Sequence, residues 1–218
     1  AASSLAVEDN VFQGLGGRAI VLEELENYGG ALAVTVQRNR IDGVCRRDEA
    51  FHDAIQARRF PGGQATVLIA CNIITGTLQG QYPHGGISIQ ETKGVQVVHN
   101  AVRGVDDGIV VGFGASDSLV ANNLLLGNRG VGIRNETGDT TFLNNAFFEN
   151  TGGPAAGLSL SESDVTADPM VDDDLRPREG SPCIDAGADT GLVTDFDQKR
   201  MPAGKAPEIG PFEASNTA

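Results

Sequence analysis

The sequence predicts an all-β solenoid, a parallel β-helix, from three observations. First, residues 86–150 contain three copies of one pattern: a glycine-led apolar strand, a polar turn, an apolar strand ending in asparagine, and a short apolar pair. Second, the asparagines at positions 100, 123 and 145 are 23 and 22 residues apart, and a fixed period in this range is typical of solenoids. Third, 29 glycines in 218 residues, with only 5% aromatic residues, suit tight turns around a narrow aliphatic core.

The same pattern recurs before residue 86, at longer intervals that indicate insertions. Successive coils of such a fold lie about 4.8 Å apart, so equivalent side chains stack. An asparagine at each bend tolerates unusual backbone angles, and its carboxamide can bond to the one on the next coil. The sequence therefore predicts a ladder of six residues: Asn10, Asn39, Asn72, Asn100, Asn123 and Asn145.

The first strand of each coil is expected to begin at a glycine. These strands are predicted at Gly17–Leu22, Gly43–Arg46, and after Gly86, Gly108, Gly130 and Gly157. Insertions at 23–30, 46–64 and 75–85 border the face that these strands form. Within the second insertion, apolar residues at helical spacing predict a short helix over 48–58.

The chain is predicted to have two parts. Residues 1–160 form the coils, and residues 161–218, rich in Asp, Pro and Gly and without a period, form a C-terminal cap and tail. A cap is expected because an open end exposes strand edges and core side chains. At the other end, residues 3–12 already resemble a coil with no cap before them. Either the solenoid continues in a longer protein, the reading we favour, or this end stacks on another subunit.

Charge and composition exclude several classes of function. The net charge of −13 repels phosphate backbones and so disfavours nucleic acid as a partner. No apolar run has the length of a membrane span. The three cysteines lack metal-binding spacing, and Cys71 and Cys183 lie in apolar strings where buried thiols are expected.

The coils at roughly 3–160 resemble the right-handed parallel β-helix superfamily, which includes pectate lyases, alginate lyases, mannuronan epimerases and many non-catalytic surface proteins. The strings Ala167-Asp-Pro, Ser181-Pro-Cys-Ile-Asp-Ala-Gly187 and Glu208-Ile-Gly-Pro-Phe-Glu213 are similar to a C-terminal signature of bacterial secreted or surface β-helix proteins. Gln198 and Pro211 depart from the glycine and alanine usual in that signature. The resemblance implies an extracellular or cell-surface location.

In the polysaccharide-acting members of this superfamily, the substrate lies across the first-strand face. Here the outward positions of that face are assigned to two rows, Cys45, Ser88 and Val110 in the first and Gln90 and Arg134 in the next, with small residues at the other positions. One arginine among small residues does not make an acid–base pair. We therefore expect a non-catalytic scaffold or carbohydrate-binding module, part of a longer protein or assembly, with a polysaccharide or cell-surface component as its partner.

Two alternatives remain open: a lyase or epimerase acting on acidic glycans, and a filament subunit that stacks through its uncapped N-terminal end. Catalysis would use His84, Tyr82 and Arg134. Substrate binding would use Ser88, Gln90, His52 and Arg58. Calcium is a possible cofactor, because carboxylates are its preferred ligands and the cap offers Asp172, Asp174, Asp195 and Asp197.

Overall fold

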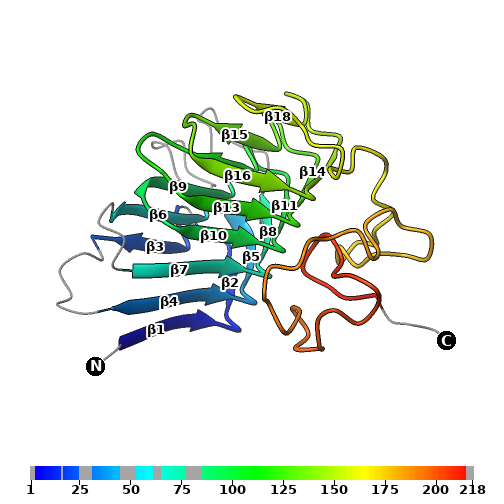
Figure 1. Ribbon diagram of the computed structural model, residues 1–218, viewed down its shortest axis with the longest axis horizontal. Helices are drawn as coiled ribbons and strands as arrows, with labels where there is room; N and C mark the ends of the chain where they lie inside the picture. The colour runs from blue at the N-terminus through cyan, green and yellow to red at the C-terminus, as the bar shows by residue number, and fades with distance from the viewer. Residues whose placement is uncertain are drawn as a thin grey trace.

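The computed structural model describes residues 3–15, 17–24, 31–44, 53–60, 65–76 and 85–214. These residues form β-strands and turns without a helix, and the strands are stacked as a right-handed parallel β-helix, which confirms the predicted fold class (Figure 1).

Each coil contributes one strand to each of three parallel six-stranded sheets. Sheet A contains the strands that end at the ladder asparagines: β1 (Ser3–Glu8), β4 (Leu32–Gln37), β7 (Ala65–Ala70), β10 (Val95–Val98), β13 (Ser118–Ala121) and β16 (Thr140–Leu143). Sheet B contains β2 (Val11–Gln13), β5 (Arg40–Val44), β8 (Ile73–Gly76), β11 (Ala101–Arg103), β14 (Leu124–Leu126) and β17 (Ala146–Phe148). Sheet C contains β3 (Ile20–Glu23), β6 (Ile55–Phe60), β9 (Ile87–Thr92), β12 (Ile109–Val111), β15 (Ile133–Asn135) and β18 (Ala155–Ala156).

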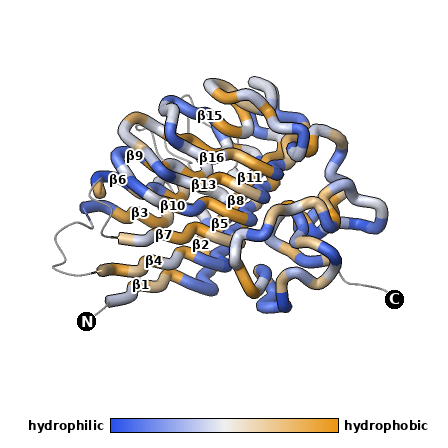
Figure 2. Tube along the Cα trace, viewed as in Figure 1, coloured by the Kyte–Doolittle hydropathy of each residue, from blue (hydrophilic) through white to orange (hydrophobic). Residues whose placement is uncertain are grey.

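Stacked aliphatic side chains fill the interior. Because side chains alternate between the two faces of a strand, paired positions form inward columns through the solenoid. One column in sheet C consists of isoleucines, all at most 6% exposed: Ile20, Ile55, Ile87, Ile109 and Ile133. Figure 2 shows hydrophobic stretches along the strands and hydrophilic residues at many of the bends.

The six asparagines at the bend between sheets A and B stand one above another. From Asn39 onward, the Oδ1 atom of each accepts the backbone N–H and the Nδ2–H of the asparagine on the preceding coil, at 2.9–3.2 Å. Asp164 ends the series, since its Oδ1 accepts the backbone N–H of Asn145 at 2.8 Å. A second, shorter ladder, absent from the sequence prediction, joins Asn128 to Asn150 at the next bend.

The unusual backbone angles at this bend belong to the residue before each ladder asparagine, which corrects the expectation that the asparagines adopt them. These residues have φ between 50° and 58°: Asp9, Arg38, Cys71, His99, Asn122 and Asn144. The side chain at this position is therefore free to vary, whereas the ladder position requires a carboxamide.

Two expectations for the second coil were wrong. Residues 55–58, placed in a helix, belong to strand β6, and 48–52 lie outside the described residues. Gly43 was taken to start a first strand, but Gly43 and Val44 end β5 in sheet B. The first strand of this coil is therefore β6, inside the stretch interpreted as an insertion. At the last coil, strand β18 ends before Gly157, where a first strand was expected.

The C-terminal segment, residues 166–214, lies along the flank of the solenoid rather than over its end (Figure 1). Its side chains pack on the outer surface of sheet B, in one cluster that includes Ile73, Ala101, Leu124, Ala146, Leu175, Cys183, Ile209 and Phe212. From β8 to β17, sheet B is consequently buried on both faces. Cys71 and Cys183 are buried free thiols, as expected, and burial raises the pKa of both, that of Cys183 to about 11.

Three of the side chains that precede a ladder asparagine hold the C-terminal segment to the solenoid. Asn122 and Asn144 donate through Nδ2 to the carbonyls of Ala188 and Ala186, each at 2.8 Å. The His99 ring lies between the Gly210 carbonyl, 3.3 Å from Nδ1, and the Asn122 carboxamide, 2.8 Å from Nε2. Burial lowers the pKa of His99 to about 4.

The same segment buries several acidic groups. Glu208 and Glu213 are each 2% exposed, and Glu208 Oε2 has no hydrogen-bond partner among the residues that the structure describes. Burial, with the neighbouring Glu213 carboxyl, raises the pKa of Glu208 to about 8. Burial also raises the pKa of Asp195, whose Oδ2 accepts the backbone N–H of Glu213.

We expect the free energy of unfolding to fall as the pH rises from 6.5 to 8. In this range folded Glu208 holds a proton that the unfolded chain has released, so deprotonation favours unfolding. Between pH 4.5 and 6.5 the lowered pKa of His99 acts in the opposite sense and offsets this slope. Urea unfolding at several pH values measures the effect, and the Glu208→Gln variant should lose most of the fall above pH 6.5. An unchanged slope in that variant would contradict the assignment to Glu208.

Candidate functional site

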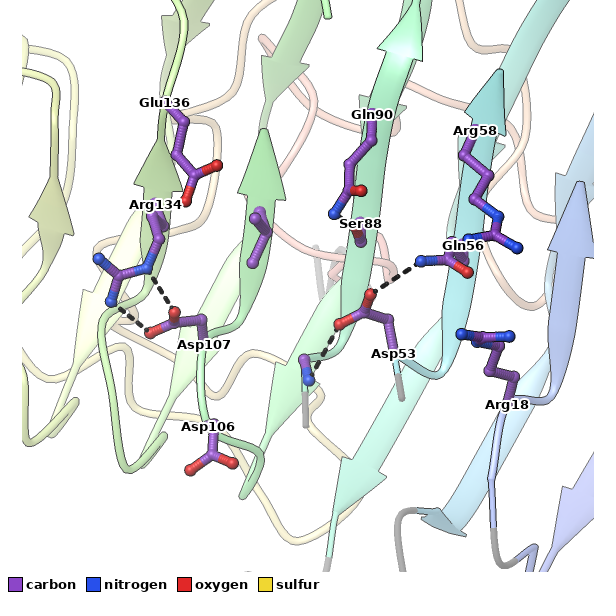
Figure 3. Close-up of a pocket in the computed structure, with 12 residues that line it drawn as sticks. Arg18, Asp53, Gln56, Arg58, Ser88, Gln90, Asp106, Asp107, Arg134 and Glu136 are labelled. Carbon is purple, nitrogen blue, oxygen red and sulfur yellow. Dashed lines mark hydrogen bonds and ion pairs between the residues drawn. The ribbon is translucent and has the colours of Figure 1, made fainter. Parts of the chain in front are cut away.

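The outer face of sheet C forms an open cleft of about 560 Å³ (Figure 3). It extends from the turn before β3 to the end of β15, across five coils. Its described lining is mostly polar or charged: Arg18, Asp53, Gln56, Arg58, Gly85, Ser88, Gln90, Asp106, Asp107, Val110, Arg134 and Glu136. No histidine or lysine is among these described lining residues.

Strand register determines which side chains enter the cleft. Gln56, Ser88, Val110 and Arg134 are paired across β6, β9, β12 and β15, so their side chains form one outward row. Their sequence neighbours point inward and are aliphatic, except Asn135 after Arg134. Arg58 and Gln90 are paired in the next outward row.

Four of the residues predicted from the sequence line this cleft: Arg134, Ser88, Gln90 and Arg58. His52, Tyr82, His84 and Cys45 lie outside the described residues. The register corrects the sequence alignment, because Arg134 shares a row with Ser88 and not with Gln90, and Gln56 occupies the position assigned to Cys45.

An ion pair lies at the β15 end of the cleft. Arg134 Nε donates to Asp107 Oδ2 at 2.6 Å, and Asp107 Oδ1 accepts the backbone N–H of Val131 at 2.9 Å. The hydrogen bond that Arg134 donates to Asp107 raises the pKa of Arg134. Arg134 is therefore a permanent cation, suited to neutralising or positioning a ligand but not to abstracting a proton.

The carboxylates Asp53 and Asp107 lie directly over glycines. A Cβ atom at Gly85 would be 2.4 Å from Asp53 Oδ1, and one at Gly130 would be 2.2 Å from Asp107 Oδ1. This close approach lets Asp53 accept the backbone N–H of Gly85 at 3.1 Å. Any side chain at either glycine would displace the carboxylate. Glycine at these two positions therefore leaves the space that the acidic groups occupy.

Sequence reasoning missed Arg18, Gln56 and Glu136. The signal for Gln56 was present, because Ile55–Phe60 alternates apolar and polar residues as Ile87–Thr92 does. Arg18 and Asp53 lie in the turns before β3 and β6, where the direction of a side chain does not follow from strand alternation.

The predicted calcium ligands do not fit a calcium site. Within the described residues, no group of three or more His, Cys, Asp or Glu side chains is placed to hold a metal ion. The four carboxylates have other partners: Asp172 accepts the backbone N–H groups of Asp174 and Arg176, Asp174 pairs with Arg40, Asp197 pairs with Arg176, and Asp195 accepts the backbone N–H of Lys199.

Comparisons with known proteins agree with this architecture. Residues 25–168 match a family model described as right handed beta helix region. Among solved structures, the crystal structure of pectate lyase Pel9A is similar, with a TM-score of 0.51 at 11% sequence identity. The similarity covers 96% of this chain but 65% of that one, so this chain spans just under two thirds of its length. At this identity the likeness concerns the fold. No curated protein matched the sequence.

Proposed function

This chain belongs to the right-handed β-helix family, and from that premise we propose that it is an extracellular or cell-surface module that binds a polysaccharide in the sheet C cleft. The observation that supports this most directly is the shape and lining of the cleft. Its five coils, about 4.8 Å apart, give a length of roughly 19 Å, enough for several units of a linear glycan.

The lining groups have the chemistry that sugars require. The Gln56 and Gln90 carboxamides, the Ser88 hydroxyl and the guanidinium groups offer donors and acceptors to hydroxyls along the whole length. Most of them project from strands, which hold side chains more rigidly than loops do. The acidic surface of the protein is consistent with a partner that is not nucleic acid.

Binding to a glycan panel tests this function. We expect the Val110→Trp variant to lose at least tenfold in affinity, because Val110 lines the cleft between Ser88 and Arg134 and an indole there would block a linear ligand. Leu119→Trp is the matched control, since Leu119 is an outward position on sheet A. Equal affinity of both variants and the parent protein would place the binding surface elsewhere.

A polysaccharide lyase or epimerase is the second candidate, and the ion pair at the β15 end of the cleft favours it. Arg134, held by Asp107, is placed to orient a sugar during proton abstraction by another group. Ultraviolet absorbance of unsaturated products would reveal lyase activity on the same panel. Binding without any product or change of sugar configuration would leave the binding module as the function.

Stacking through the N-terminal end is a third candidate. The edges of β1, β2 and β3 lack a further strand among the described residues, and Leu5, which points inward, is 44% exposed. Asp164, however, ends the asparagine ladder at the other end, and its side chain accepts but does not donate when ionised. This disfavours a head-to-tail filament. Mass photometry over a concentration series tests self-association, and a strict monomer would remove this candidate.

None of the described residues form a helix of the length and apolarity that a membrane crossing needs.

A further inference from the structure

Hydrogen-bonding atoms without partners gather at the end of the cleft nearest β3. Arg18 has neither a hydrogen bond nor an ion pair within the described part of the chain, and its Nε is buried. Arg58 Nε and Gln56 Oε1 are likewise buried without a partner. In Figure 3 these three side chains lie beside one another on the β3–β6 side of the cleft.

Such a group of atoms is unusual in a folded protein. Buried polar groups are nearly always paired, and each unpaired donor or acceptor disfavours the folded state. Two neighbouring guanidinium groups also repel each other. Glu23 neutralises Arg58 only in part, because its Oε1 is shared between Arg58, at 2.9 Å, and Arg59, also at 2.9 Å. The arrangement therefore favours an added anion.

The opposite end of the cleft is neutralised by the protein itself. Asp107 accepts two hydrogen bonds from Arg134, and Asp106 pairs with Arg129. These arginines have protein carboxylates as partners, which leaves little charge for an acidic ligand to satisfy. The cleft is thus asymmetric along its length, with its unsatisfied positive charge at the β3–β6 end.

We propose that Arg18 and Arg58 form a subsite for an oxyanion substituent of the bound glycan, a carboxylate or a sulfate ester. The guanidinium N–H groups of both arginines donate to the oxyanion, and the Gln56 carboxamide accepts a hydrogen bond from a hydroxyl of the same sugar. Units further along the cleft, towards β15, are neutral. This subsite rests on the proposed polysaccharide-binding function and adds to it which unit of the ligand is charged.

The test compares three oligosaccharides of equal length by titration calorimetry: one carrying uronate units, one carrying sulfate esters on a neutral backbone, and that backbone unmodified. We expect at least one acidic ligand to bind tenfold or more tightly than the neutral one, since charge-assisted hydrogen bonds are the stronger class. Preference between the two acidic ligands identifies the oxyanion. The preference should weaken with added salt.

Variants assign the effect to Arg18. Arg18→Gln should remove most of the preference for the acidic ligand, because it weakens binding of the acidic ligand much more than binding of the neutral one. Arg18→Lys keeps the charge but lacks the Nε–H, and should fall between the two. Arg103→Gln, which removes an arginine from sheet B on the far side of the solenoid, is the control and should behave as the parent. Because Arg18 has no partner in the described structure, its replacement should leave the thermal unfolding midpoint unchanged or higher.

The outcomes separate the subsite from the general function. If the neutral ligand binds and neither acidic ligand binds more tightly, the subsite is refuted while polysaccharide binding stands. If the acidic preference persists in Arg18→Gln at the parental level, the subsite is also refuted. If no ligand binds, the proposed function fails together with it.

Discussion

Replacing Asn100 with aspartate is expected to lower the free energy of unfolding by about 4 kcal/mol at neutral pH, the range typical of an uncompensated buried charge. Asn100 is fully buried, and its Nδ2 donates to the carbonyls of Ile69 and Val98 and to Asn123 Oδ1, at 2.9–3.1 Å. Aspartate has almost the same shape but would present a negative oxygen to three acceptors. Urea unfolding at pH 7 measures the loss.

The same substitution at Asn10 provides a matched control. Asn10 starts the ladder and is exposed, so water can solvate an aspartate there, and we expect a cost below about 1 kcal/mol. If both variants lost the same free energy of unfolding, burial of Asn100 would not explain the cost of the aspartate. If Asn100→Ser lost as much free energy of unfolding as Asn100→Asp, the cost would come from the missing hydrogen-bond donors and not from the charge.

The strands and the ladder could be predicted because the solenoid repeats a local pattern. Each coil places its apolar alternation and its asparagine against the same groups of the coil beside it, so sequence spacing translates directly into contact. The prediction failed at β6, where the insertion disturbed the spacing. Over a window as short as residues 51–58, apolar residues at strand spacing and at helical spacing overlap, and the pattern does not separate them.

The position of the C-terminal segment could not be read from its own sequence, because residues 166–214 have no period. The part of the sequence that indicates where this segment packs lies in the solenoid strands. Leu124–Leu126 is apolar at three successive positions, and a strand with apolar residues on both faces is one that is covered on both faces. The cleft was predicted in part for the same reason: strand residues such as Ser88 follow alternation, whereas Arg18 and Asp53 depend on the direction of turns.

Replacing Phe212 with alanine is expected to lower the free energy of unfolding by about 3–5 kcal/mol, the usual cost of removing a buried aromatic side chain. Phe212 is 1% exposed and packs in the cluster between sheet B and the C-terminal segment. Its ring centroid is 5.3 Å from that of Phe196, and the guanidinium carbon of Arg176 lies 3.9 Å above it. Urea unfolding gives the global loss.

Limited proteolysis and hydrogen exchange distinguish two ways in which this loss can arise. If the segment were an independent tail, Phe212→Ala would expose residues 166–214 to protease and leave the coils as protected as before. Because Leu124 and Ile73 pack against this segment, we expect the amides of β14 and β8 to lose protection as well. Phe113→Ala, at a position 80% exposed, should change neither measurement. Unaltered exchange in sheet B of the Phe212 variant would mean that the solenoid is stable without its flank.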